Sequence, residues 1–113
     1  IEQFGRGCFI KGSPTQQDVE LAAAGLKKVQ QALASRKYDL IILDEINIAL
    51  KLKLLPLKEV INLIKKLPAK TELVLTGRYC PPQIIKLADL VTVMKDVKHY
   101  YNRGIIARKG IEH

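Results

Sequence analysis

The sequence predicts an α/β fold in which a parallel sheet is flanked by helices. Three short apolar runs, each of strand length, alternate with amphipathic segments along the 113 residues. The runs are nearly continuous in Leu, Ile and Val, which is typical of strands covered on both faces in a parallel sheet. Hydrophobic residues make up 48% of the chain, enough for a folded core. We therefore expect residues 1–113 to form a single domain with a doubly wound sheet.

The helical segments are predicted from apolar spacing and from their end signals. Residues 15–36 carry apolar side chains three and four positions apart, and Thr15 with Asp18 offers a capping-box start. A second helix is expected over residues 56–66, with its proline in the first turn. A third, shorter helix is expected over residues 82–88.

The strands are predicted at the three apolar runs. These are YDLIILD at 38–44, TELVLT at 71–76 and DLVTVM at 89–94. A weak strand is expected at residues 1–4, and the tail from Lys95 onward is expected to be irregular. The order of helix, strand, helices, strand, helix and strand favours an open parallel sheet. No repeat, low-complexity tract or linker divides the chain.

The net charge of +8 raises the question of a nucleic-acid partner. The surplus is spread out, with five bases against three acids in residues 1–36, seven against five in 37–76 and seven against three in 77–113. The densest stretch, residues 95–109, includes Tyr100 and Tyr101, which are able to stack on bases. Solvated lysines explain the same stretch, so a nucleic-acid role is not favoured.

Other classes of protein are disfavoured by what the sequence lacks. No window approaches the roughly 20 apolar residues that span a bilayer, and the first residues do not resemble a signal peptide. Cys8 and Cys80 lie far apart, without CxxC spacing or histidine pairs, so neither a zinc site nor a disulfide framework is indicated. We expect a soluble protein of the cytoplasm.

Two acids, Asp44 and Glu45, follow the four aliphatic residues of the first long strand. Ligands of open parallel sheets bind outside the carboxyl ends of the strands. Acids at that place are typical of a Walker B element, in which a carboxylate reaches Mg²⁺ on a bound nucleotide. The alternative is a strand that ends in a turn with two solvated acids.

A glycine and an arginine follow the second strand. Gly77 permits close backbone approach, and Arg78 is expected at the same sheet edge as the acids. A guanidinium there suits phosphate oxygens. The alternative is that Arg78 pairs with Glu45. Cys80, between Tyr79 and a proline, is either a nucleophile or a structural thiol, and the second interpretation is favoured.

A glycine-rich turn, GRGCF, lies at residues 5–9. Two glycines around an arginine suggest a loop that approaches a ligand closely, although a tight turn explains the same residues. Nowhere does the chain carry the GxxxxGK[ST] motif of a P-loop. Without that motif, the residues present are not expected to hold a triphosphate in the usual way.

Taken together, these motifs resemble one family, the P-loop-type ATP:corrinoid (cob(I)alamin) adenosyltransferases. The resemblance is carried by GRGCF at 5–9, YDLIILDE at 38–45, LLPLKEVINLI at 54–64, ELVLTGRYCPPQIIKLADLVT at 72–92 and VKHYYNRGIIARKGIEH at 97–113. It implies a RecA-like P-loop fold that is incomplete at the N-terminus, because the family's P-loop segment would precede Ile1. The chain alone is therefore expected to bind ATP poorly.

The resemblance also implies an activity and a set of roles. The family transfers the 5′-deoxyadenosyl group of ATP to the cobalt of a reduced corrinoid and releases triphosphate, with Mg²⁺ or Mn²⁺. By this resemblance Glu45 and Asp44 hold the metal, and Gly77 and Arg78 contact the ATP phosphates. The corrinoid contacts fall on Gly5, Arg6, Gly7, Cys8, Phe9 and Ile10. A cytoplasmic homodimer with a flavoprotein reductant is implied. The alternatives are a RecA-like ATPase and a basic nucleic-acid-binding module.

Overall fold

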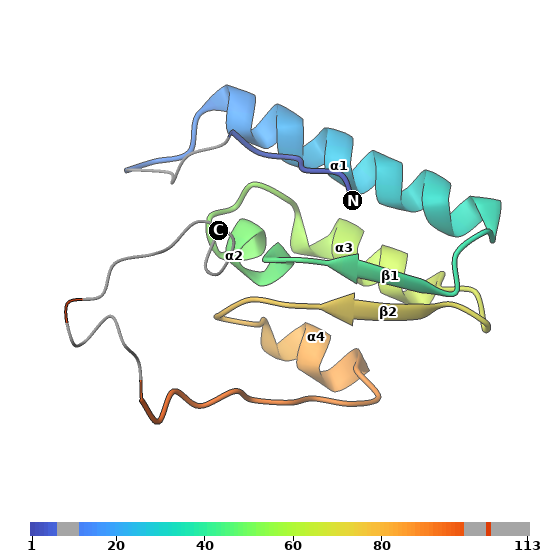
Figure 1. Ribbon diagram of the computed structural model, residues 1–113. Coiled ribbons are helices and arrows are strands. Elements are labelled where there is room, and N and C mark those ends of the chain that lie inside the picture. Colours follow the sequence, from blue (N-terminus) through green and yellow to red (C-terminus); the bar gives the residue numbers. More distant parts are fainter. Residues whose placement is uncertain (7–11, 99–103, 105–113) are drawn as a thin grey trace.

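The computed structural model describes residues 1–6, 12–98 and 104 (Figure 1). The helices and strands, in chain order, are α1 (Gln16–Ser35), β1 (Leu40–Leu43), α2 (Ile46–Lys51), α3 (Leu57–Lys65), β2 (Glu72–Leu75) and α4 (Pro82–Leu87). This is an α/β arrangement, as the sequence predicts. Among the described residues, no helix is long and apolar enough to cross a membrane.

The two strands form a parallel pair. Leu40 lies opposite Glu72 and Leu43 lies opposite Leu75. The pairing continues past both ends, because the Glu72 N–H donates to the Asp39 carbonyl at 2.8 Å and the Thr76 N–H to the Leu43 carbonyl at 3.2 Å. Parallel strands need a long crossover, which α2 and α3 supply. Both strands point the same way in Figure 1, so their carboxyl ends lie together beside α2.

The long helix α1 begins as the sequence predicts. Thr15 is its N-cap, and the capping box with Asp18 is complete in both directions. The helix ends at Arg36, which adopts the left-handed conformation with φ 53°. A left-handed residue at that place terminates a helix by turning the chain away from its axis.

The core lies where the helices meet one face of the strand pair. Its buried side chains come from all four helices and one connection: Leu26, Leu33, Ile46, Leu50, Leu55, Val60, Leu63 and Ile84. Ile41, Leu43, Leu73 and Leu75 pack against this cluster from the strands. Because strand side chains alternate between faces, the other residues of β1 and β2 point away from the core.

Val60 is fully buried, with 0% of its surface exposed. We expect Val60→Ala to lower the free energy of unfolding by about 2 kcal/mol, since two buried methyl groups are lost and the neighbours only partly close the cavity. Denaturant unfolding measures this as a lower midpoint with an unchanged slope. Lys58→Ala, on the exposed side of the same helix, should leave the midpoint nearly unchanged.

The strand predicted at 89–94 is absent from the structure, and this prediction is wrong. The segment is extended but unpaired, and Leu90, Val93 and Met94 are 84–94% exposed. Figure 1 shows it beyond α4, away from β2. Extended apolar residues become a strand only where a neighbouring strand exchanges backbone hydrogen bonds with them. The sheet of the described residues consists of β1 and β2, and residues 89–94 do not pair with it.

Three further predictions need correction. Residues 1–4 lie along α1 and form no strand, because the Phe4 ring packs on Gly25, where an added Cβ would be 2.8 Å from Phe4 Cγ. Coverage of the strands on both faces is also wrong for the described residues, since Leu40, Ile42 and Val74 are 40–57% exposed. Pro56 is the N-cap of α3 and not a residue of its first turn.

Candidate functional site at the carboxyl ends of the strands

A short hydrogen-bond network joins the carboxyl ends of β1 and β2. The Thr76 hydroxyl donates to Asp44 Oδ1 at 2.6 Å and accepts the Glu45 backbone N–H at 2.9 Å. One threonine therefore fixes both predicted acids relative to the end of the neighbouring strand.

Glu45 adopts an unusual backbone conformation. Its φ is 58°, in the left-handed region, and it forms the N-cap of α2. Its carbonyl accepts the N–H groups of Ile48 and Ala49, which begins the helix. A left-handed residue other than glycine is uncommon and often marks a functional site. Both acids are exposed, so their carboxylates are accessible to a cation.

Gly77 brings the second loop against Glu45. Its φ is +114°, which side-chain-bearing residues rarely adopt. A Cβ at this position would lie 3.1 Å from Glu45 Oε2 and 3.2 Å from the Asn47 Cβ. The close approach that the sequence predicts for this glycine is therefore present, and its partner is the Glu45 side chain.

Arg78 and Tyr79 complete this loop. No ion pair joins Arg78 to Glu45 in the structure, so the predicted alternative of an Arg78–Glu45 pair is wrong, and the exposed guanidinium follows directly on Gly77. Tyr79 is left-handed, with φ 63°. The Lys51 ammonium of α2 lies 5.4 Å from the centre of its ring, within the range of a cation–π contact.

Cys80 fits the structural interpretation. Burial raises the pKa of its thiol, which leaves little of the thiolate that acts as a nucleophile. The side chain packs against the core cluster. Cys8 lies outside the described residues.

Asn47, on the first turn of α2, was not predicted from the sequence. It is 4% exposed, its N–H donates to the Thr76 carbonyl at 3.2 Å, and its Nδ2 donates to the Gly77 carbonyl at 3.1 Å. Its Oδ1 is buried and has no hydrogen-bond partner among the described residues. The signal in the sequence was a polar residue within the apolar run INIAL, and it was missed because no helix was assigned to that run.

Arg6, which the sequence places in the glycine turn, is tied to the beginning of α1. Arg6 binds Asp18 through two of its nitrogens, Nε to Oδ1 at 2.7 Å and Nη2 to Oδ2 at 2.8 Å. The same carboxylate accepts the N–H and hydroxyl of Thr15 at 2.8 and 2.9 Å. Gly5 is exposed, and a Cβ added to it would meet no other described residue within 4 Å. Gly7, Cys8, Phe9 and Ile10 lie outside the described residues.

The Arg6–Asp18 pair makes stability depend on pH. The Arg6 guanidinium, followed by the Thr15 N–H, lowers the pKa of Asp18 from 3.8 to about 2. A carboxyl whose pKa is lower in the folded state stabilises the fold above its unfolded pKa, and this stabilisation is lost as pH falls. We expect Asp18→Asn to lower the melting temperature by several degrees at pH 7. The difference from the unchanged protein should shrink between pH 4 and pH 2 in thermal unfolding followed by circular dichroism.

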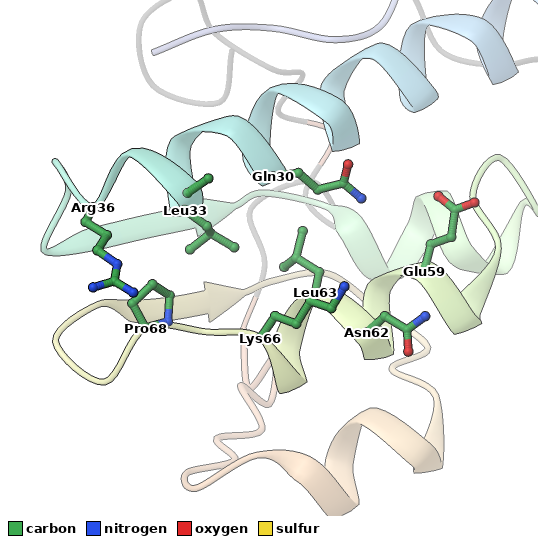
Figure 2. Close-up of a pocket in the computed structure, with 9 residues that line it drawn as sticks. Gln30, Leu33, Arg36, Glu59, Asn62, Leu63, Lys66 and Pro68 are labelled. Atoms are coloured by element: carbon green, nitrogen blue, oxygen red, sulfur yellow. The ribbon is translucent and has the colours of Figure 1, made fainter.

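A groove among the described residues lies elsewhere. It occupies about 540 Å³ between the C-terminal half of α1 and α3. Figure 2 shows Gln30 and Leu33 of α1 facing Glu59 and Leu63 of α3 across it. None of the residues predicted for the site lines this groove. The groove is therefore separate from the candidate site at the carboxyl ends of β1 and β2.

The described residues thus form an α/β protein whose parallel strands present two acids and a Gly-Arg turn at their carboxyl edge. Residues 1–113 match the model of the family described as ATP:corrinoid adenosyltransferase BtuR/CobO/CobP. The chain belongs to this family, which confirms the resemblance drawn from its motifs.

Individual relatives agree with the family match. The chain is 42% identical over 109 residues to a corrinoid adenosyltransferase of Pseudomonas aeruginosa, covering 96% of this chain and 54% of the relative. It is 35% identical over 110 residues to one of Sinorhizobium sp, covering 96% and 51%. It is 33% identical over 101 residues to one of Escherichia coli K12, covering 86% and 52%. The chain spans about half the length of these relatives.

Proposed function

We propose that the protein containing this chain transfers the 5′-deoxyadenosyl group of ATP to the cobalt of a reduced corrinoid. The observation that carries this proposal is the family match over all 113 residues. In the transfer, the electron pair of Co(I) attacks the ribose 5′-carbon and forms the cobalt–carbon bond. The bond between C5′ and oxygen breaks, and the triphosphate leaves with its electrons.

The acids at the end of β1 fit a bound Mg²⁺ or Mn²⁺. Two exposed carboxylates, Glu45 first and Asp44 second, offer the oxygen atoms that such hard cations prefer. Among the described residues no group of three His, Cys, Asp or Glu residues gathers as a metal cage. Mg²⁺ typically uses one or two carboxylates together with substrate phosphates, so this pair is sufficient. The ion would neutralise charge on the leaving triphosphate.

Gly77 and Arg78 are proposed to contact the ATP phosphates. The exposed guanidinium lies in the loop whose glycine touches Glu45, so a single bound polyphosphate would be shared between a cation at the acids and Arg78. Arginine can engage phosphate oxygens through two parallel hydrogen bonds. The protein's part in catalysis is then to orient the 5′-carbon and to hold the leaving group.

The corrinoid is proposed to contact the turn at residues 5–10. Arg6, near the start of this segment, is held by Asp18 at the N-terminal end of α1. In Figure 1 that end of α1 lies on the same side of the molecule as the carboxyl ends of the strands. The two substrates would then approach from one side.

The assembly and the cellular context are also proposals. We propose a cytoplasmic homodimer that receives reduced corrinoid with the help of a flavoprotein reductant. The spread of the +8 charge over all parts of the chain does not favour nucleic acid as a partner.

The identity of the leaving group tests the function against ATP hydrolysis. The full-length protein is incubated with Mg²⁺ and ATP, with and without reduced corrinoid, and the phosphorus products are followed by ³¹P NMR. Adenosyl transfer predicts triphosphate in an amount equal to the corrinoid consumed. ADP and phosphate formed without corrinoid would instead support a RecA-like ATPase.

A further inference from the structure

Asn47 lies where the two strand-end loops meet. It follows Glu45 by two residues and contacts the backbone beyond β2 at two successive carbonyl groups, those of Thr76 and Gly77. Its backbone N–H holds the first carbonyl and its side-chain Nδ2 holds the second. The loop with Gly77 and Arg78 is thus fixed to the helix that begins at Glu45.

The contact with Gly77 depends on the side chain alone. Nδ2 and the Gly77 carbonyl are 3.1 Å apart, and the Asn47 Cβ packs at 3.2 Å from where a Gly77 Cβ would lie. The Gly77 carbonyl belongs to the peptide that leads into Arg78. The Asn47 side chain therefore contacts the peptide from which Arg78 begins.

The choice of a buried asparagine is costly for the fold. The residue is 4% exposed and its Oδ1 has no partner among the described residues. Leaving a buried polar atom unpaired destabilises a fold, whereas an apolar side chain of the same shape avoids that cost. A buried and incompletely paired group in a native structure calls for a functional explanation.

We propose that Asn47 is a positioning residue for the nucleotide site. It holds the Gly77–Arg78 turn against Glu45, so that the guanidinium and the carboxylate face the same polyphosphate. This assignment rests on the proposed function for its choice of ligand. The positioning itself is a property of the protein without ligand and can be measured separately.

The first test measures the order of the turn by ¹⁵N relaxation in the full-length protein. In Asn47→Leu we expect the order parameters of the Gly77 and Arg78 amides to fall from about 0.85, typical of rigid backbone, to below about 0.6. Asn47→Asp is the second variant, for use if Asn47→Leu does not fold. It keeps the shape of the side chain, but its carboxylate cannot donate to Gly77, so it should lower the same order parameters to a similar extent. Asn62→Leu, the same change at an exposed position of α3, should leave them unchanged.

The second test asks whether the ordered turn serves ATP. We expect Asn47→Leu to raise the KM for ATP about tenfold with the KM for corrinoid unchanged, which a general loss of stability would not do. Because Asn47 acts through Arg78, adding Asn47→Leu to Arg78→Ala should raise the KM for ATP by less than about twofold over Arg78→Ala alone.

The outcomes separate this proposal from the proposed function. Unchanged order parameters in both Asn47 variants overturn the positioning role, whatever the kinetics. If the order parameters fall but the effects of Asn47→Leu and Arg78→Ala on the KM for ATP are additive, then Asn47 positions the turn without contributing to ATP binding, and that part of the proposal is overturned. If Arg78→Ala alone leaves the KM for ATP unchanged, the phosphate role of Arg78 fails, while the relaxation data still decide whether Asn47 positions the turn.

Discussion

Gly77→Ala should reduce kcat/KM for ATP by about 10²-fold while the protein remains folded, because small displacements of positioned groups have effects of that size. The backbone at this position has φ +114°, and an added methyl group would meet Glu45 Oε2 at 3.1 Å and the Glu45 Cα at 3.3 Å. The carboxylate can rotate away, but the backbone contact cannot be relieved without moving the loop. The change therefore displaces both Glu45 and the start of Arg78.

A second glycine separates crowding from backbone strain. Gly104 also has a positive φ, +79°, but no atom of the described residues lies within 4 Å of the position of its Cβ. Gly104→Ala should leave kcat/KM within about twofold, since substitutions away from packed features have small effects. Steady-state kinetics with ATP varied compare the two variants. Equal losses in both would mean that the contact with Glu45 is irrelevant to the site.

Glu45→Gln should abolish most of the metal-dependent reaction, with a fall in kcat of about 10²-fold or more, as is typical when a group that stabilises leaving-group charge is removed. Glutamine has nearly the same shape as glutamate, so the left-handed N-cap of α2 and its backbone bonds at Ile48 and Ala49 are kept. What is lost is the negative charge that attracts the cation.

Metal titration distinguishes this effect from a loss of folding. With Glu45→Gln, activity should require a higher Mg²⁺ concentration, and Mn²⁺ binding in the presence of ATP, followed by electron paramagnetic resonance, should weaken. Glu59→Gln, at an exposed position of α3, should change neither. Asp44→Asn should have a smaller effect, because one Asp44 oxygen is already bonded to Thr76. An unchanged Mg²⁺ dependence in Glu45→Gln would contradict the ligand role.

Local features of the fold were predictable because they depend on neighbouring residues. The capping box of Thr15 and Asp18 is a pattern within four residues, and the structure has it complete. The apolar runs at β1 and β2 predicted strands because short runs of aliphatic residues suit a pleated, half-buried surface. The meeting of Glu45 and Gly77 at one edge followed from the parallel direction of the two strands.

Other features were not predictable because they depend on distant partners. The run at residues 89–94 has strand composition, but strand formation requires a neighbour to pair with, and composition does not reveal one. The contact of Arg6 with Asp18 spans twelve positions, and the glycines beside Arg6 gave no sign of it. Asn47 acts on carbonyl groups about thirty residues away. Only the folded chain shows these contacts.

The central claim is that the polypeptide carrying this chain forms a bond between cobalt and the 5′-carbon of ATP. The most direct measurement uses ATP labelled with ¹³C at the 5′-position, together with Mg²⁺, reduced corrinoid and the full-length protein, and follows the label by NMR. The claim predicts a new ¹³C resonance at the position of a carbon bonded to cobalt. Its intensity should increase with the protein concentration and with the reaction time. Label that stays in ATP, or passes to ADP with the corrinoid unchanged, would contradict it.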